Sequence, residues 1–264
     1  MPSPPQAQGW PSISAGRHTL IMAPTGSGKT LAAFLVVPLN ALLADALAGR
    51  DLAAGVHVLY VSPLRALNYD SDRNLQRPME GIRAAARELG LDVGRLTSAV
   101  RTGGTTGAER QRMVRRPPQI LITTLESLFA MLTSSRARAM LRAVRYVIVD
   151  EIHAIAGSKR GAHLSLTLER LERLTARPFQ RIGLSATQRP LPTIAAFLGG
   201  REAVGVAGEF RARPVQIVDL GVRRDIDLRV DVPVEDLRNL PGGSVWPSGG
   251  RHPGTPRPIR RNTA

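Results

Sequence analysis

The sequence contains no cysteine among its 264 residues. Disulfide bonds and thiolate metal sites are therefore excluded, and neither is needed in a reducing cytoplasm, where we expect the protein to act. The N-terminus lacks the basic and then apolar layout of a signal peptide. The most apolar segment, Leu31–Ala48, is interrupted by Pro38, Asn40 and Asp45, so we predict a buried core helix and no membrane span.

Lysine is almost absent too. Only Lys29 and Lys159 occur, so 36 − 2 = 34 of the basic residues are arginine. The formal net charge of +15 predicts a polyanionic partner, with nucleic acid as the first candidate. The alternative is an arginine-rich composition inherited from a GC-rich genome. The length and the hydrophobic content of 43% fit one large or two small globular domains.

The clearest motif is Ala-Pro-Thr-Gly-Ser-Gly-Lys-Thr, between a short apolar run and a long apolar segment. This context predicts a phosphate-binding loop between a strand and a helix. Glycine lets backbone N–H groups close on phosphate oxygens, the lysine supplies a charge for the β- and γ-phosphates, and the last threonine a hydroxyl for Mg²⁺. The predicted nucleotide-binding residues are Ala23, Pro24, Thr25, Gly26, Ser27, Gly28, Lys29 and Thr30. The alternative is an ordinary glycine-rich turn before a helix.

The second motif is Tyr146–His153, an apolar run that ends in two carboxylates. Acids at the edge of a buried sheet are costly unless a cation or hydrogen bonds compensate. With a phosphate loop upstream, we expect Asp150 to hold Mg²⁺ and Glu151 to deprotonate the attacking water. The alternative is that both acids cap the next helix.

Short β-branched runs alternate with longer Ala/Leu/Arg segments, which predicts a mostly parallel sheet covered by helices on both faces. The predicted strands are Thr19–Met22, Val56–Val61, Val93–Thr97, Ile120–Thr123, Val144–Val149, Arg181–Leu184, Val215–Val218 and Leu228–Val232. The predicted helices are Thr30–Leu47, Leu64–Leu89, Ala108–Val114, Leu125–Leu132, Leu164–Thr175 and Pro192–Phe197. Ligands of such sheets bind at the carboxyl ends of the strands.

Five weaker signals lie in the proline-rich leader or at these strand ends. Each has an ordinary explanation when taken alone, as a solvated side chain, a helix cap or a turn. They are Gln6, Arg65 within Ser62–Leu67, the Gly-Thr segment Arg101–Gly107, Thr123–Leu128, and the hydroxyls Ser185 and Thr187.

In this order and spacing, these motifs resemble the first RecA-like domain of superfamily-two DEAD/DEAH-type helicases, in particular the large helicase-related family, over about Pro4–Leu237. The resemblance implies an ATP-dependent DNA or RNA helicase with a P-loop NTPase sheet, and ATP and Mg²⁺ as cofactors. Gln6 would read adenine, and His153 would link the ATP site to Ser185 and Thr187. The residues implied along the tracking strand are Arg65, Gly104 and Thr124.

Several features depart from the family pattern. Leu125 stands where proline is usual, Gly104 where an acid is common, and no aromatic residue precedes Gln6. We expect the RecA-like domain over residues 1–200, its end over 201–240, and a disordered Gly/Pro/Arg-rich tail over 241–264. No Gln-x-x-Gly-Arg-x-x-Arg segment of a second RecA-like domain occurs. We therefore expect a truncated or frameshifted product that binds ATP with little hydrolysis. The alternative function is a vestigial module that binds ATP and nucleic acid without turnover.

Overall fold

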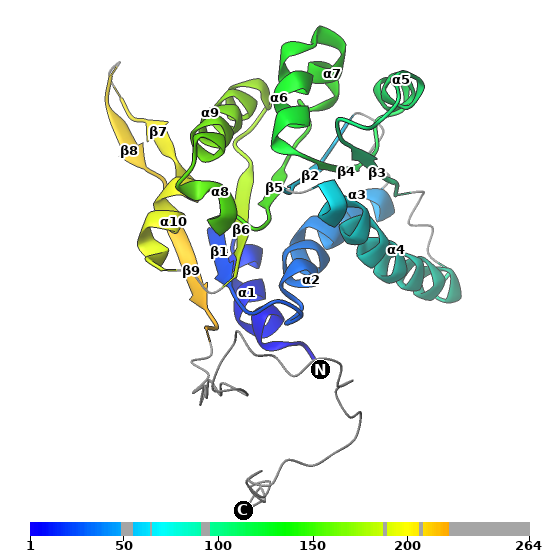
Figure 1. The fold of residues 1–264 in the computed structure, drawn as a ribbon. Coiled ribbons are helices and arrows are strands. Elements are labelled where there is room, and N and C mark those ends of the chain that lie inside the picture. The colour runs from blue at the N-terminus through cyan, green and yellow to red at the C-terminus, as the bar shows by residue number, and fades with distance from the viewer. Residues whose placement is uncertain (49–54, 64, 91–95, 187–188, 206–207, 222–264) are drawn as a thin grey trace, which may run out of the picture. The chain divides into compact units, whose positions relative to one another are not determined.

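The computed structural model describes residues 1–48, 55–63, 65–90, 96–186, 189–205 and 208–221, which belong to one compact unit, Met1–Val222 (Figure 1). The predicted strand Leu228–Val232, the tail over 241–264 and Thr187 lie outside the described residues. The domain boundaries expected at residues 200 and 240 stay predictions.

Seven parallel strands form the central sheet in the order β3-β4-β2-β5-β6-β1-β9. They are β1 (His18–Met22), β2 (Val58–Val61), β3 (Ser98–Arg101), β4 (Ile120–Thr123), β5 (Tyr146–Val149), β6 (Gln180–Ser185) and β9 (Val215–Asp219). Two short strands, β7 (Arg201–Ala203) and β8 (Phe210–Ala212), form a separate antiparallel pair. The predicted α/β fold with a parallel RecA-like sheet is confirmed.

Helices cover both faces of the sheet, because successive strand residues point to opposite sides. Leu59 and Val61 pack into one hydrophobic cluster, and Val58 and Tyr60 into the other. The first cluster lies under α6 (Leu125–Thr133), α7 (Ser135–Met140), α8 (His153–Ala156), α9 (Lys159–Leu174) and α10 (Leu191–Gly199). The second lies under α1 (Pro4–Ser14), α2 (Lys29–Phe34), η1 (Leu35–Leu39), α3 (Asn40–Leu47) and α4 (Arg65–Glu88). The short helix α5 (Gly107–Arg115) follows β3 (Figure 1).

The prediction for the third strand was wrong. We expected Val93–Thr97, but the strand is Ser98–Arg101, and residues 93–95 lie outside the described part. β3 is an edge strand whose four residues are all half-buried. We placed the strand on the more apolar neighbouring segment, but a strand at the edge of a sheet does not require a continuous apolar run.

The proline-rich leader, for which we predicted no element, is the helix α1. Ser3 is the N-cap residue, and the side chain of Gln6 accepts a hydrogen bond from the Ser3 N–H at 2.8 Å. Pro4 and Pro5 occupy the first turn, where a missing N–H costs nothing. Ile13 then anchors the helix in the core.

The long helix predicted over Thr30–Leu47 is divided into α2, the π-helical turn η1 and α3. Pro38 lies within η1, where its ring and missing N–H disturb the regular hydrogen-bond ladder. Ala33, Leu39 and Leu42 are buried, as the core-helix prediction requires. In the described part of the chain, no helix is long and apolar enough to cross a membrane.

Candidate functional site

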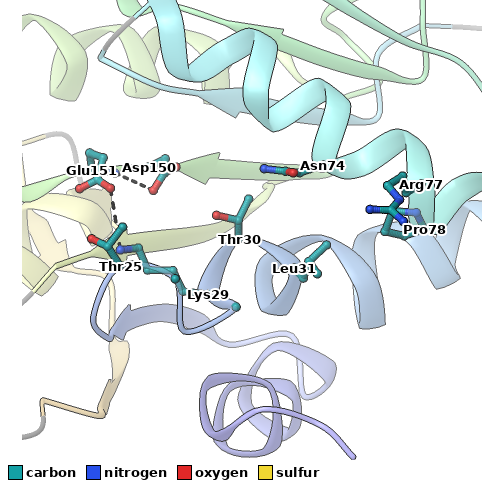
Figure 2. Close-up of a pocket in the computed structure, with 11 residues that line it drawn as sticks. Thr25, Lys29, Thr30, Leu31, Asn74, Arg77, Pro78, Asp150 and Glu151 are labelled. Carbon is teal, nitrogen blue, oxygen red and sulfur yellow. Dashed lines mark hydrogen bonds and ion pairs between the residues drawn. The ribbon is translucent and has the colours of Figure 1, made fainter.

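The two strongest sequence motifs meet at one cavity of about 710 Å³ beside the carboxyl ends of β1 and β5 (Figure 2). Lys29 is the first residue of α2, directly after the loop that follows β1, and Asp150 and Glu151 follow β5 directly. The lining residues are Thr25, Gly26, Gly28, Lys29, Thr30, Leu31, Asn74, Arg77, Pro78, Asp150 and Glu151. Two predicted sets that lie about 120 positions apart in sequence thus share one cavity.

The loop after β1 has the backbone that its glycines allow. Gly26 and Gly28 have φ values of +78° and +88°, a region that disfavours residues with a Cβ atom. A Cβ on Gly28 would also lie 3.0 Å from Ser3 Oγ and 3.6 Å from Gln6 Nε2. Gln6 therefore lies beside the loop, although it does not line the cavity. Ala23 is fully buried, so its methyl group is accommodated where the strict motif has glycine.

Lys29 is buried beside an acid. Its ammonium group lies 3.8 Å from Glu151 Oε1 and donates a hydrogen bond to the Ala23 carbonyl at 3.4 Å. Only 5% of Lys29 is exposed. A buried ammonium group needs such partners, and Glu151 lines the same cavity, where an anion would compete for the charge of Lys29.

Burial raises the pKa of Asp150, and the nearby negative charge of Glu151 adds to this effect. Hydrogen bonds from the Tyr60 hydroxyl and the Glu151 N–H, and the charge of Lys29, act in the opposite direction. Tyr60 was not predicted from the sequence, although a tyrosine inside the apolar strand β2 is the kind of residue that needs a polar partner. The pKa of Asp150 remains raised, because burial disfavours its charged form more than these contacts favour it.

Glu151 and His153 form a polar link from the cavity to β6. His153 Nδ1 accepts a hydrogen bond from the Ala186 N–H at 3.2 Å, so the ring proton of the neutral imidazole is on Nε2. Nε2 lies 3.4 Å from Glu151 Oε2. Glu151 has φ +45°, an uncommon conformation for a residue other than glycine. Ser185, the predicted coupling residue, is fully buried next to Ala186 and donates to its carbonyl at 3.0 Å.

Helix α4 supplies the far side of the cavity, and this role of α4 was not predicted from the sequence. Asn74, Arg77 and Pro78 lie on α4 above α2 (Figure 2). Asn74 and Arg77 are exposed polar residues of a long amphipathic helix, so nothing in their spacing distinguishes them from other surface residues.

A second cavity of about 390 Å³ lies at the carboxyl ends of β2, β3 and β4. It is lined by Pro63, Arg101, Thr102, Gly103, Arg110, Thr124, Glu126, Ser127, Ala130 and Arg160. Thr124, predicted for this face, caps α6 by accepting a hydrogen bond from the Ser127 N–H at 3.3 Å. The helix therefore starts normally with Leu125 in place of the family's proline. Gly104 is adjacent to the lining residue Gly103, whereas the side chain of Arg65 lies outside the described part.

Three arginines, Arg101, Arg110 and Arg160, make this second cavity cationic. Of these, only Arg101 lies in a segment that was singled out from the sequence. Arg101 Nη1 is buried with no hydrogen-bond partner among the described residues, and burial together with nearby Arg110 lowers the pKa of Arg101. Arg110 donates to the Gly103 carbonyl at 3.1 Å. Arg160 pairs with Glu126 at 2.7 Å. A buried guanidinium nitrogen without a partner is a feature expected of an anion-binding cavity.

Comparison with known proteins identifies the family. The profile of the DEAD/DEAH box helicase family matches residues 3–193. The chain belongs to this family. The predicted family membership is therefore confirmed, on a match that includes both sequence motifs and both cavities.

Similar proteins include the Lhr helicase/probable uracil glycosylase of Mycolicibacterium smegmatis, 50% identical over 93% of this chain. The ATP-dependent helicase Lhr-Core of Methanocaldococcus jannaschii is 44% identical over 92% of this chain. The chain spans 15% and 27% of the length of these two relatives.

Two solved structures show the same fold. The helicase Lhr of Mycobacterium smegmatis bound to ssDNA and AMP-PNP is 49% identical, with a TM-score of 0.78 over 91% of this chain and 28% of that one. The DEAD-box helicase Mss116 bound to ssRNA and UDP-BeF is 20% identical, with a TM-score of 0.64 over 82% of this chain and 39% of that one. The second likeness supports the fold alone.

Proposed function

We propose that this chain is the nucleotide-binding part of an ATP-dependent nucleic-acid helicase that acts in the cytoplasm. The observation that carries the proposal is the ion pair between Lys29 Nζ and Glu151 Oε1, 3.8 Å apart, at a cavity that Thr30 and Asp150 also line. This contact supports a phosphate-binding cation and a carboxylate base that lie side by side at one cavity, where both would reach the same bound triphosphate.

Each side chain has a role that its surroundings support. The N–H groups of the loop and the Lys29 ammonium group would bind the phosphates, with Gln6 beside the loop to read adenine. Glu151 would take the proton of the attacking water. The Nε2–H of His153 would hold the Glu151 carboxylate in position, because Nδ1 of the same ring is fixed by the Ala186 N–H.

Thr30 and Asp150 fit a Mg²⁺ site. Burial disfavours the charged form of Asp150, and a bound cation would relieve that cost. Carboxylate and hydroxyl oxygens are the ligands that Mg²⁺ prefers, directly or through water. When bound, Mg²⁺ would neutralise charge on the β- and γ-phosphates. Asp150 then acts as a ligand, and Glu151 remains free to act as the base.

The second cavity supports nucleic acid as the partner. Thr124, the backbone near Gly104, and Arg65 at the start of α4 would follow the phosphate backbone of a single strand, together with Arg101, Arg110 and Arg160. The solved Lhr structure contains ssDNA, which agrees with this assignment. A second RecA-like domain is expected to complete the ATP site, as the family resemblance implies.

Nucleotide binding tests the proposal with this chain. Binding of a fluorescent ATP analogue with Mg²⁺ is expected for the wild type and is expected to fall at least tenfold in Lys29→Ala. Lys159→Ala, the other lysine, is the matched control. Equal binding by wild type and Lys29→Ala would overturn the assignment. ATP and DNA binding without nucleic-acid-stimulated hydrolysis, even with a second RecA-like domain supplied, would support the non-hydrolysing module.

A further inference from the structure

A third cavity, of about 460 Å³, is lined by four arginines and lies outside both sites described above. Its lining residues are Leu132, Arg138, Arg142, Arg170, Arg173 and Leu174, so the set includes no acid. The arginines come from α7, the segment after it, and the last turns of α9. We call this cavity, with its four arginines, the arginine pocket. Helix α6 packs against both α7 and α9, which brings these segments together (Figure 1).

Among the described residues, no acid lines the arginine pocket. Arg138, Arg142, Arg170 and Arg173 are all exposed, and none takes part in the ion pairs found among the described residues. Elsewhere on the surface, Arg145 pairs with Asp45 and Arg211 with Glu202. Like charges that converge without an acid repel one another, and although water weakens this repulsion, an anion in the pocket would relieve it.

Packing also restricts one of the guanidinium groups, that of Arg170. The guanidinium carbon of Arg170 lies 5.2 Å from the centre of the Phe129 ring, and that ring in turn contacts His163. A stacked guanidinium group loses less side-chain freedom when it binds an anion. Arginine also recognises phosphate in a bidentate manner, which lysine does not.

Helices α9 and α6 both extend from the second cavity to the arginine pocket. Helix α9 carries Arg160 near its start and Arg173 near its end, and 13 residues at 1.5 Å each separate them by about 20 Å. Helix α6 likewise contributes Ser127 to the second cavity and Leu132 to the arginine pocket. At 3.4 Å per phosphate along one strand of a duplex, about six phosphates cover this distance.

We propose that the arginine pocket is a second nucleic-acid contact, which binds phosphodiester groups of the same molecule that occupies the second cavity. This inference rests on the proposed function, because it takes nucleic acid as the partner. A single strand and a duplex arm present the same phosphate chemistry, and the experiment below separates them. An acidic protein surface is the competing occupant, and it predicts no effect on nucleic-acid binding.

The test is the salt dependence of binding to a labelled single strand and to the same strand with a duplex arm. The variant Arg138→Gln/Arg142→Gln/Arg173→Gln removes three charges and keeps Arg170, whose ring contact supports packing. The control Arg17→Gln/Arg87→Gln/Arg201→Gln removes three exposed charges elsewhere. If each arginine neutralises one phosphate, the slope of log K against log salt becomes shallower by about 2 for a single strand and about 2.7 for a duplex.

The expected result is this loss of slope in the pocket variant and a change of less than about 1 in the control. A loss confined to the DNA with the duplex arm assigns the contact to duplex, and a loss with both DNAs assigns it to the single strand. Arg138→Lys/Arg142→Lys/Arg173→Lys should keep the wild-type slope, because its charge is unchanged.

Equal slopes for pocket variant and control would overturn the inference while leaving the proposed function intact, and an acidic protein partner would then be favoured. Failure of the wild type to bind either DNA would instead reject the proposed function. All three substituted arginines are exposed, so thermal melting should confirm that each variant is folded.

Discussion

Asp150→Asn is expected to stabilise the protein without ligand and to remove its stabilisation by Mg²⁺ and nucleotide. Asp150 is 5% exposed, and burial raises its pKa, so the charged form costs folding free energy at neutral pH. Asparagine has nearly the same shape. Its oxygen can accept the hydrogen bond from the Glu151 N–H, and its NH₂ group can donate to the Tyr60 oxygen.

The change therefore removes a buried charge while both hydrogen-bonded contacts remain. We expect a gain of about 1–2 kcal/mol, the usual size of a single stabilising substitution. In a unit of this size, that gain raises Tm by about 2–8 °C. Differential scanning fluorimetry in EDTA measures it, with the surface acid Asp219, paired with the exposed Arg189, substituted by asparagine as the control. The control should change stability by less than about 0.5 kcal/mol.

The pH dependence has a definite sign. The folded-state pKa of Asp150 lies above the unfolded value, so the folded wild type binds this proton more tightly. The free-energy cost of the charge on Asp150 is present in full above the folded-state pKa. It declines as pH falls through that pKa and disappears below the unfolded-state pKa. The Tm difference between Asp150→Asn and wild type should narrow as the buffer is acidified. A destabilised variant at neutral pH, or a difference that does not change with pH, would refute the reasoning.

Three further substitutions have expected outcomes. Glu151→Gln should lower ATP turnover by about 10²–10⁴-fold in a chain supplied with a second RecA-like domain, with nucleotide binding retained; turnover that survives would exclude Glu151 as the base. Gly28→Ala should cost about 1–2 kcal/mol in denaturant melts and weaken nucleotide binding, because φ is +88° and Ser3 Oγ lies 3.0 Å from the new Cβ. Arg181→Met should cost about 3 kcal/mol in urea unfolding, since its removal takes a buried ion-pair partner from Glu169 and Glu172 and a hydrogen-bond donor from the Leu198 carbonyl; a cost under about 1 kcal/mol would contradict that.

The sequence predicted the fold and the centre of the candidate site because both follow local rules. In a parallel sheet, every strand ends at the same edge, so the loop before Thr30 and the acids after β5 had to meet there. The edge strand β3 and helix α1 were missed because half-buried and proline-rich segments carry weak hydrophobic periodicity.

The remaining site residues depend on packing between distant segments, which one sequence does not encode in its spacing. Tyr60 reaches Asp150 from another strand, and Arg160 reaches the second cavity from α9. The arginine pocket was hidden for a different reason. With 34 arginines in the chain, only the arrangement of helices separates four that converge from the many that are merely on the surface.

The nucleotide cavity gathers three unfavourable features in an otherwise well-packed fold. Lys29 is a buried ammonium group, Asp150 a carboxylate whose charge burial disfavours, and Glu151 a residue with positive φ. Strain of this last kind costs about 1–3 kcal/mol, and it persists only where the surroundings enforce it. A triphosphate with Mg²⁺ would compensate the charges of Lys29 and Asp150. The link through His153 to Ala186 holds Glu151 in its uncommon backbone conformation. We therefore expect ligand binding to be coupled to the stability of this edge of the sheet.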